Sequence, residues 1–201
     1  MITLAIETST PRGSLAVHDG TRLLIDEQFA ADRRTTATLF PLLKRVLEAG
    51  PAPEQIAVGL GPGSYAGVRI AIAAAMGVAM AKKARLVGIP SVATFSREHY
   101  VAVGDARRET FYWTEVDAGV CLDGPRLVDE AELRARLGVA GVAVFATEVL
   151  TVVPQAVAAT PFAAILAELA AAGRGIVMRE TLDPIYLREP HITQPKVKGT
   201  K

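Results

Sequence analysis

A glycine-rich loop that runs into a long, nearly uncharged helix is the feature that most constrains this chain. Residues 59–81 read GLGPGSYAGVRIAIAAAMGVAMA, and from Val68 to Ala81 only Arg69 is polar. The segment before it, 55–60 (QIAVGL), predicts a short buried strand, so the chain passes from strand to loop to helix. A helix that is apolar around nearly its whole circumference must be covered on more than one side. The stretch therefore predicts an α/β fold built around this helix.

Elements of both types precede and follow this helix. In the first half, strands are predicted over 2–8, 13–20, 22–29, 55–60 and 85–90, with helices over 35–50 and from Ser64 onward. In the second half, the patterns predict two strands around a turn at 105–109, a helix over 129–138, a strand over 141–147 and a helix over 161–173. The opening order βββαβαβ is typical of an α/β fold with a mixed sheet. We expect two lobes, 1–97 and 98–190, followed by a mobile tail over 191–201.

Composition limits the functional classes. The chain has 201 residues and a formal net charge of +1, so it lacks the strongly basic balance of proteins that bind nucleic acid by themselves. Cys121 is the only cysteine, which excludes an internal disulfide. The first residues do not resemble a secretory signal, and the longest apolar run, 70–81, is shorter than the roughly 20 residues that span a bilayer. We expect a cytoplasmic protein without a membrane segment.

The glycine loop fits neither of the two common phosphate-binding fingerprints. A P-loop requires G-x-x-x-x-G-K-[ST], and this loop has no lysine. A dinucleotide fingerprint requires G-x-G-x-x-G, whereas Gly61, Gly63 and Gly67 have the wrong last spacing. Backbone N–H groups at the helix start still suit an anion. The alternative is a tight strand-to-helix turn in which Ser64 caps the helix.

Other catalytic chemistries lack their residues. The three histidines, His18, His99 and His191, are isolated from one another and from any cysteine, so no transition-metal site is expected. The surroundings of Ser64 do not match the G-x-S-x-G nucleophile elbow. A nuclease of the ribonuclease H type needs several converging carboxylates, and only Glu7 ends a strand of the first sheet.

Six stretches together carry a resemblance to a known family. They read LAIETST, GSLAV, GLGPGSYAGVRIAIAAAMGVA, VGIPSVATF, DARRETFYWTEV and DPIYLRE. In this combination the chain resembles the TsaB (YeaZ) family of bacterial tRNA threonylcarbamoyladenosine biosynthesis proteins, along nearly its whole length. The resemblance implies an actin-like ATPase (ASKHA) fold with two ribonuclease H-type lobes and mixed sheets, the second lobe being abbreviated.

The resemblance also implies a function and partners. TsaB-like proteins are noncatalytic paralogues of TsaD, and they act with TsaD and the ATPase TsaE to place a threonylcarbamoyl group on the tRNA adenosine beside the anticodon. The segment after the third strand, ADRRTTATLFPLL, lacks the histidine pair of the catalytic member, and Thr35 and Thr36 stand where many family members have a histidine. The loop 105–109 carries bulky charged side chains in place of a second glycine-rich phosphate loop. We therefore expect no cofactor or metal on the isolated chain, with ATP and magnesium only in the complex. The resemblance also allows a homodimer of the free chain and contact with tRNA through the complex.

Two helix faces are the expected partner interface. In the helix after the glycine loop, Val68, Ile72, Met76 and Met80 form a bulky stripe that suits the chain's own sheet, and a second stripe is mostly small. The expected interface joins this second stripe to the preceding helix and comprises Leu39, Leu42, Leu43, Val46, Ala66, Ile70, Ala73 and Gly77. The alternative is that the preceding helix covers the small stripe inside the monomer.

A second hypothesis is an autonomous actin-like kinase or ATPase acting on a small molecule. Its nucleotide would lie near Glu7, Thr8, Ser9, Gly61, Gly63 and Ser64. Glu7 could face a phosphate-bound metal, or it could be an exposed carboxylate at a strand end. Tyr112 and Trp113 alternate along a strand, so we expect one in the core and the other at the surface or at an interface.

Overall fold

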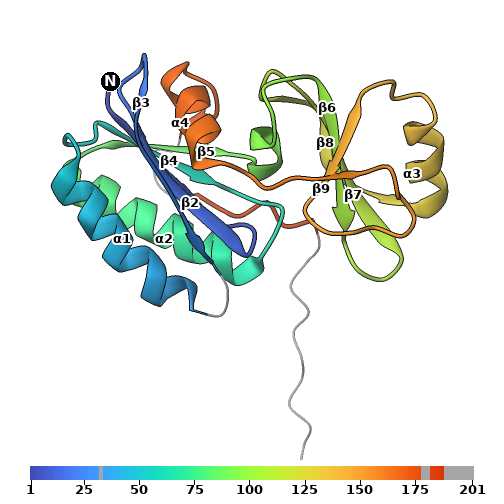
Figure 1. Cartoon of the computed structure of the whole chain (residues 1–201), viewed down its shortest axis with the longest axis horizontal. Coiled ribbons are helices and arrows are strands. Elements are labelled where there is room, and N and C mark those ends of the chain that lie inside the picture. Colours follow the sequence, from blue (N-terminus) through green and yellow to red (C-terminus); the bar gives the residue numbers. More distant parts are fainter. Residues whose placement is uncertain (32–33, 178–181, 188–201) are drawn as a thin grey trace, which may run out of the picture.

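Two mixed β-sheets, one in each lobe, form the framework of the molecule (Figure 1). The computed structural model describes residues 1–31, 34–177 and 182–187, and the expected tail at 191–201 lies outside the described residues. The first sheet has the strand order β11-β5-β4-β1-β2-β3, and the second has the order β10-β9-β6-β7-β8.

The first sheet begins with the three antiparallel strands that the sequence predicts. Its strands are β1 (Thr3–Glu7), β2 (Arg12–His18), β3 (Leu23–Ala30), β4 (Gln55–Gly59), β5 (Arg85–Ile89) and β11 (Ile176–Val177). β4 joins β1 in parallel and β5 joins β4 in parallel, whereas β11 is antiparallel to β5. The sheet is therefore mixed, because helical crossovers follow an antiparallel meander.

Helices cover both faces of this sheet. Helices α1 (Thr35–Ala49) and α2 (Tyr65–Lys82) pack on one face, where they meet Leu4 and Ile6 of β1. Helix α4 (Ala163–Ala171) packs on the other face, where Ala5 of β1 leaves space for it. Alternate residues of a strand point to opposite faces, so the sequence LAI places large side chains under α1 and α2 and a small one under α4.

The second sheet repeats the strand order of the first. Its elements are β6 (Tyr100–Asp105), β7 (Thr110–Asp117), β8 (Val120–Asp129), α3 (Glu130–Leu137), β9 (Ala143–Ala146) and β10 (Val157–Ala158). The pairing β10-β9-β6-β7-β8 matches β5-β4-β1-β2-β3 strand for strand, with the same parallel and antiparallel neighbours. A loop of turns over 147–156 stands where α2 stands in the first lobe, so the second lobe is abbreviated.

The chain does not divide at a single point. Residues 163–177 return to the first sheet, since α4 packs on it and β11 pairs with β5. The expectation that all of 98–190 belongs to the second lobe is therefore wrong for residues 163–177. A buried cluster joins the lobes, because Tyr100 and Tyr112 of the second sheet share it with α4 and with Ile89.

The second sheet is also covered on both faces. Tyr112 is buried in the cluster between the lobes, and Trp113 is buried on the opposite face with Leu133 of α3. Neither of these two aromatic residues lies at the surface, which was one of the two expected positions, because α3 and the loop 147–156 close the outer face and Tyr112 packs between the lobes.

Helix α2 begins where the sequence predicts, and both of its ends are defined. The Ser64 hydroxyl accepts a hydrogen bond from the N–H of Gly67 at 3.2 Å, so Ser64 is the N-cap, and Lys83 ends the helix with φ of 54°. Among the described helices, α2 has the length and mean hydropathy of a membrane span, and its inner side packs on the first sheet.

Candidate functional site

A cleft of about 720 Å³ lies between the two lobes. Its walls come from the loops that follow β1 and β4, from the start of α2, from the second lobe and from the segment that follows β11. The lining residues used below are Ser9, Gly61, Gly63, Ser64, Tyr65, Asp105, Arg107, Glu148 and Tyr186. Clefts between lobes are frequent ligand sites because two rigid units meet there.

The glycine loop is fixed to the turn between β1 and β2. The N–H of Ser64 donates to the carbonyl of Ser9 at 2.7 Å, and the N–H of Gly61 donates to the Ser91 hydroxyl at 2.9 Å. A Cβ at Gly63 would lie 2.3 Å from the Ser9 carbonyl oxygen, and Gly63 has φ of 158°. Glycine is required at this position because the two loops touch through their backbones.

Glu7 lies beneath this loop and is fully buried. Its Oε1 accepts a hydrogen bond from the N–H of Ser9 at 2.6 Å, whereas Oε2 has no partner of standard geometry. Burial raises the pKa of the Glu7 carboxyl above its ordinary value, although the nearby hydroxyl groups of Ser91 and Ser9 act in the opposite direction. A Cβ at Gly59 would lie 1.8 Å from Glu7 Oε2, so this glycine makes room for the carboxyl.

Four of the six residues expected near a nucleotide line the cleft, namely Ser9, Gly61, Gly63 and Ser64. Glu7 and Thr8 do not line it. The Thr8 hydroxyl donates to the Gly67 carbonyl at 2.8 Å and so attaches β1 to α2. The interpretation of Glu7 as an exposed strand-end carboxylate is wrong, because η1 (Ser91–Thr94) and β4 cover the end of β1.

The wall contributed by the second lobe is crowded with charged side chains. Arg107, Arg108 and Glu109 have φ of 67°, 56° and 58°, which is the left-handed region that bulky residues rarely adopt. The N–H of Arg107 donates to Asp105 Oδ1 at 2.7 Å, and the N–H of Asp105 donates to Glu148 Oε1 at 2.6 Å. Two carboxylates therefore border this side of the cleft.

Two tyrosine rings line the cleft, and one guanidinium packs on the first of them. Tyr65 of α2 and Tyr186 have ring centroids 5.5 Å apart. The Arg69 Nη1 donates to the Tyr65 hydroxyl at 2.5 Å, and its Cζ lies 5.2 Å from the Tyr65 ring centroid. These contacts raise the pKa of the Arg69 guanidinium, chiefly through the hydrogen bond to Tyr65. The DPIYLRE motif thus places an aromatic side chain beside the glycine loop, which the sequence alone did not reveal.

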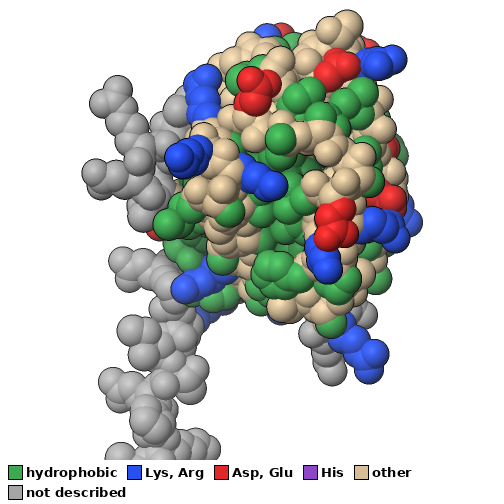
Figure 2. Space-filling model, turned by 90° about the vertical axis from the view of Figure 1, so that its left-hand side faces the viewer, with side chains coloured by type: hydrophobic (Ala, Val, Ile, Leu, Met, Phe, Trp, Pro, Cys, Tyr) green, Lys and Arg blue, Asp and Glu red, His purple; other side chains and the backbone are tan. Residues whose placement is uncertain are grey.

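The outer side of α2 is open. Ala66, Ala73 and Gly77 are exposed and Ile70 is half-buried. A Cβ at Gly77 would meet no atom within 4 Å, so α1 does not cover this position. The bulky stripe is buried at Val68 and Ile72 and half-buried at Met76, but Met80 is 80% exposed, contrary to expectation. On the outer end of the first lobe, hydrophobic side chains gather between charged ones (Figure 2).

Helix α1 contributes less to this surface than expected. Leu39, Leu43 and Val46 are buried against the first sheet, and Leu42 is half-buried. The prediction that these three buried side chains meet a partner is wrong for the folded monomer, because their stripe is the one that holds α1 on the sheet. Phe40, which is 46% exposed, lies on the outer side of α1 instead.

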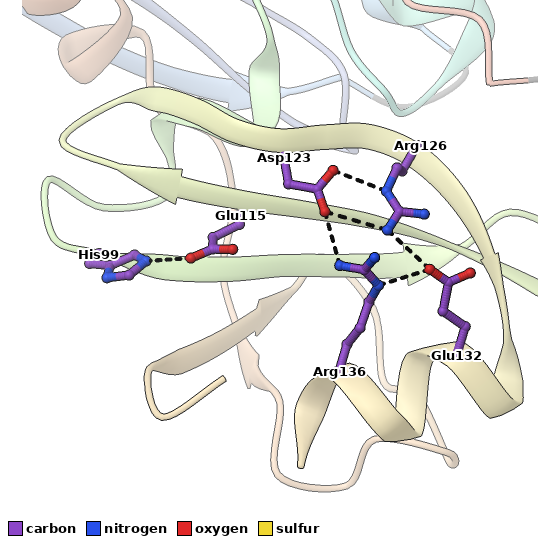
Figure 3. Close-up of polar contacts among 6 residues, drawn as sticks. All are labelled: His99, Glu115, Asp123, Arg126, Glu132 and Arg136. Carbon is purple, nitrogen blue, oxygen red and sulfur yellow. Dashed lines mark hydrogen bonds and ion pairs between the residues drawn. The ribbon is translucent and has the colours of Figure 1, made fainter. Parts of the chain in front are cut away.

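Charged side chains of the second lobe form a separate cluster on its outer face (Figure 3). Arg136 joins Asp123 at 2.9 Å and Glu132 at 2.8 Å, and Arg126 joins the same two carboxylates at 3.0 Å each. The Arg136 guanidinium lies 5.4 Å from the Trp113 ring centroid. The cluster attaches α3 to β8, so we interpret it as structural. Among residues 1–31, 34–177 and 182–187, no three His, Cys, Asp or Glu side chains converge on a metal site.

Comparisons with known proteins point to one family. Residues 30–131 match the family described as TsaD: tRNA N6-adenosine threonylcarbamoyltransferase. The chain is 30% identical over 126 residues to the tRNA threonylcarbamoyladenosine biosynthesis protein TsaB of Escherichia coli, covering 56% of this chain and 53% of that protein. It is also 30% identical over 140 residues to an uncharacterized protein of Mycobacterium tuberculosis, covering 65% of this chain and 66% of that protein. The chain thus spans about half the length of the E. coli relative.

Solved structures extend the likeness to nearly the whole fold. YeaZ from Pseudomonas aeruginosa is 26% identical, with a TM-score of 0.74, over 92% of this chain and 99% of that chain. Another P. aeruginosa structure, described as an uncharacterized protein with similarity to peptidase YEAZ, is 26% identical with a TM-score of 0.77 over 93% and 99% of the two chains. The two mixed sheets and these neighbours fit the expected actin-like, ASKHA-type fold. The chain belongs to the TsaD family of tRNA N6-adenosine threonylcarbamoyltransferases, as a TsaB-like (YeaZ-like) member.

Proposed function

We propose that this chain is a noncatalytic subunit of the bacterial machinery that makes threonylcarbamoyladenosine in tRNA. It would act in the cytoplasm by binding and supporting a TsaD-like catalytic paralogue, together with a TsaE-like ATPase. The family membership and the TsaB relatives support this role. The observation that carries the proposal is the open outer side of α2, an apolar helix that the monomer covers on one side only.

The open side of α2 has the shape that a second helix requires. Ala66, Ala73 and Gly77 are small and spaced along one face, so a partner backbone can approach closely. Phe40 of α1 and Met80 at the end of α2 add exposed apolar area. Interfaces with an apolar centre and a charged rim are typical of stable subunit contacts. A paralogue with the same fold would present a matching pair of helices, which suits a helical-bundle interface.

The second lobe supports a noncatalytic role. A nucleoside triphosphate bound between two such lobes would need a phosphate-binding loop on each side. The loop 105–109 places charged side chains where a phosphate would have to reach the backbone. ATP and magnesium would then act at the level of the complex. The alternative of an autonomous kinase or ATPase predicts sustained ATP hydrolysis by the purified chain with magnesium, which we expect to be negligible.

The test is a charge placed at the centre of the proposed interface. Ala73→Glu should leave the chain folded, because the side chain is exposed, and should abolish its association with the purified catalytic paralogue in analytical ultracentrifugation. A carboxylate buried in an apolar interface costs several kcal/mol. The same variant should no longer support tRNA modification in a reconstituted reaction.

Two variants control this experiment. Ala135→Glu makes the same substitution at an exposed position of α3 in the other lobe, and its association should equal that of the wild type. Ile72→Glu buries a charge against the first sheet and should unfold the chain. Intact association of Ala73→Glu, or unfolding of that variant, would reject this interface.

A further inference from the structure

The open side of α2 carries a guanidinium among small side chains. Ala66, Ala73 and Gly77 mark this side, and all three are exposed. Arg69 is exposed on the same side, because residues three and four apart are neighbours on a helix surface and Arg69 lies between Ala66 and Ala73 at these spacings. A partner helix that covers the small side chains therefore also covers the Arg69 guanidinium.

A covered guanidinium needs an acceptor from the partner. An ion pair that stays in water contributes little to stability. On an apolar helix face the partner excludes water, and a charge without a counter-charge there is strongly unfavourable. The partner that fits this face must therefore place an anionic group at Arg69.

Two tyrosines hold Arg69 in position before any partner arrives. Arg69 Nη1 donates to the Tyr65 hydroxyl at 2.5 Å, and its Cζ lies 5.2 Å from the Tyr65 ring centroid. Tyr186 in turn lies against Tyr65, with 5.5 Å between the ring centroids. A side chain that is already ordered loses less entropy on binding. The guanidinium has several N–H donors, and those that do not contact Tyr65 suit the forked contact that a carboxylate makes.

The chain does not supply this carboxylate itself. Within the described residues, Arg69 has hydroxyl and ring partners and forms no ion pair. Helix α2 contains no Asp or Glu. Two carboxylates beside or on α1 already have partners of their own, since Glu48 joins Lys44 at 3.7 Å and Glu27 of β3 joins Arg45 at 3.0 Å.

The charges of α1 and α2 also distinguish a second copy from a different partner. The charged residues of the two helices are Lys44, Arg45, Glu48, Arg69 and Lys82. If two copies packed their α2 helices in parallel, Arg69 would meet Arg69. If the helices packed antiparallel, Arg69 would approach the end that carries Lys82. Like charges across an interface lower its affinity, so this face disfavours a copy of itself.

We propose that the open side of α2 selects a protein partner whose facing helix carries a carboxylate, that Arg69 binds this carboxylate, and that the same charge disfavours a homodimer through α2. The proposal rests on the proposed partner-binding role and adds the chemistry by which the partner is recognised. Arg69 is thus a specificity-determining residue at one end of the interface.

The experiment is sedimentation velocity of the full chain, alone and with the purified catalytic paralogue, at about 50 mM and about 500 mM NaCl. Association with the paralogue should weaken about fivefold at the higher salt concentration, because opposite charges meet. The chain alone should be monomeric at the lower salt concentration. Self-association there that is as tight as association with the paralogue would overturn the proposal.

Variants of Arg69 locate the contact. Arg69→Gln should weaken association with the paralogue about tenfold to 100-fold and remove most of its salt dependence. Arg69→Lys keeps the charge and should weaken association by less. Arg134→Gln on α3 removes the same charge from the other lobe and should associate like the wild type. Arg69 is exposed, so the far-UV circular dichroism of its variants should equal that of the wild type.

A charge exchange identifies the partner's carboxylate. Arg69→Glu should abolish association, and one Asp→Lys or Glu→Lys substitution on the paralogue's facing helix should restore it. If the wild type does not bind the paralogue at either salt concentration, the proposed function fails and this proposal fails with it. If the wild type binds and Arg69→Gln binds equally well, this proposal alone is overturned. Loss of tRNA binding by Arg69→Gln with unchanged association would assign Arg69 to RNA and would also overturn it.

Discussion

The two lobes share one strand order and differ in what is placed between the strands. In the first lobe, β4 and β5 are joined through the glycine loop and the 18-residue helix α2. In the second lobe, β9 and β10 are joined by the short loop 147–156. The helix after the third strand has 15 residues in the first lobe and 8 residues in the second. The same sheet topology thus supports a large apolar helical surface in one lobe only.

This difference gives the two lobes different surfaces. The first lobe carries the open face of α2, where the partner contacts are expected. It also carries the buried Glu7 and the glycine loop, which lines the cleft. The second lobe closes its outer face with α3 and a charged cluster, and it contributes a wall to the cleft. Helix α4 connects the two, because it lies in the buried cluster that both sheets share.

The largest expected effect tests whether the lobes unfold as one unit. Leu166→Ala removes a fully buried side chain of α4 and should lower the free energy of unfolding by about 2–5 kcal/mol. Trp113 is the only tryptophan and lies in the second lobe, so its fluorescence reports that lobe, while far-UV circular dichroism reports both. The unfolding transitions measured by tryptophan fluorescence and by circular dichroism should both shift to lower denaturant concentration by the same amount.

The control for this prediction is Leu122→Ala, at a side chain of β8 that is 59% exposed. It should change the free energy of unfolding by less than about 0.5 kcal/mol. A tryptophan transition that stays in place in Leu166→Ala would show that the lobes are energetically separate.

The next effect contrasts one carboxyl from each lobe through pH. Burial raises the pKa of Glu7 in the folded chain above 4.5, so its contribution to stability is complete below that pH and is lost as the pH rises through the raised pKa. The free energy of unfolding of the wild type, relative to that of Glu7→Gln, should therefore decrease as the pH rises from about 4 to about 8. Urea unfolding at both pH values measures this difference.

Glu132 of the second lobe should show the opposite dependence of stability on pH. Hydrogen bonds from Arg136 and Arg126 lower its pKa, so its contribution is present above the unfolded pKa and is lost as the pH falls. The stability of the wild type relative to Glu132→Gln should fall on acidification instead. The same direction for both variants would contradict the assigned environments.

A glycine pair compares the two sides of α2. Gly77→Ala should stabilise the isolated chain by about 0.5–1 kcal/mol, because alanine favours a helix interior and its Cβ meets no atom within 4 Å. Gly67→Ala should destabilise it, because that Cβ would lie 2.1 Å from the Thr8 carbonyl oxygen. Thermal unfolding of both variants checks the signs, and a destabilising Gly77→Ala would mean that the outer side of α2 is not open.

The smallest effect concerns the charged cluster of the second lobe. A double-mutant cycle with Arg136→Ala and Asp123→Ala should give a coupling free energy of about 0.5–1 kcal/mol that decreases in 1 M salt. The same cycle on Lys44 and Glu48 of α1, which are 3.7 Å apart and exposed, should give less. Equal coupling in both lobes would contradict a stabilising role of the cluster.

Local patterns in the sequence predicted most of the elements. The βββαβαβ order, the helix start at Ser64 and the small, exposed stripe of α2 all follow from periodicity and capping, which depend on neighbouring residues. The strand β8 was missed, because Val120–Asp129 is a mostly half-exposed edge strand with weak alternation. The repeated lobe was expected only through the family resemblance and not from local patterns, because strand order depends on which strands pair across the chain.

The site divides in the same way. The sequence by itself predicted the glycine loop with the cap at Ser64 and the small stripe of α2, since each depends on neighbouring residues, and the structure places the loop at the cleft and the stripe at the surface. Only the tertiary structure decided that Leu39 and its neighbours face the sheet, that Glu7 is buried and that Tyr186 lies against Tyr65. These three outcomes depend on contacts between segments far apart in the chain. Periodicity determines that a helix has an apolar side, whereas packing determines what covers that side.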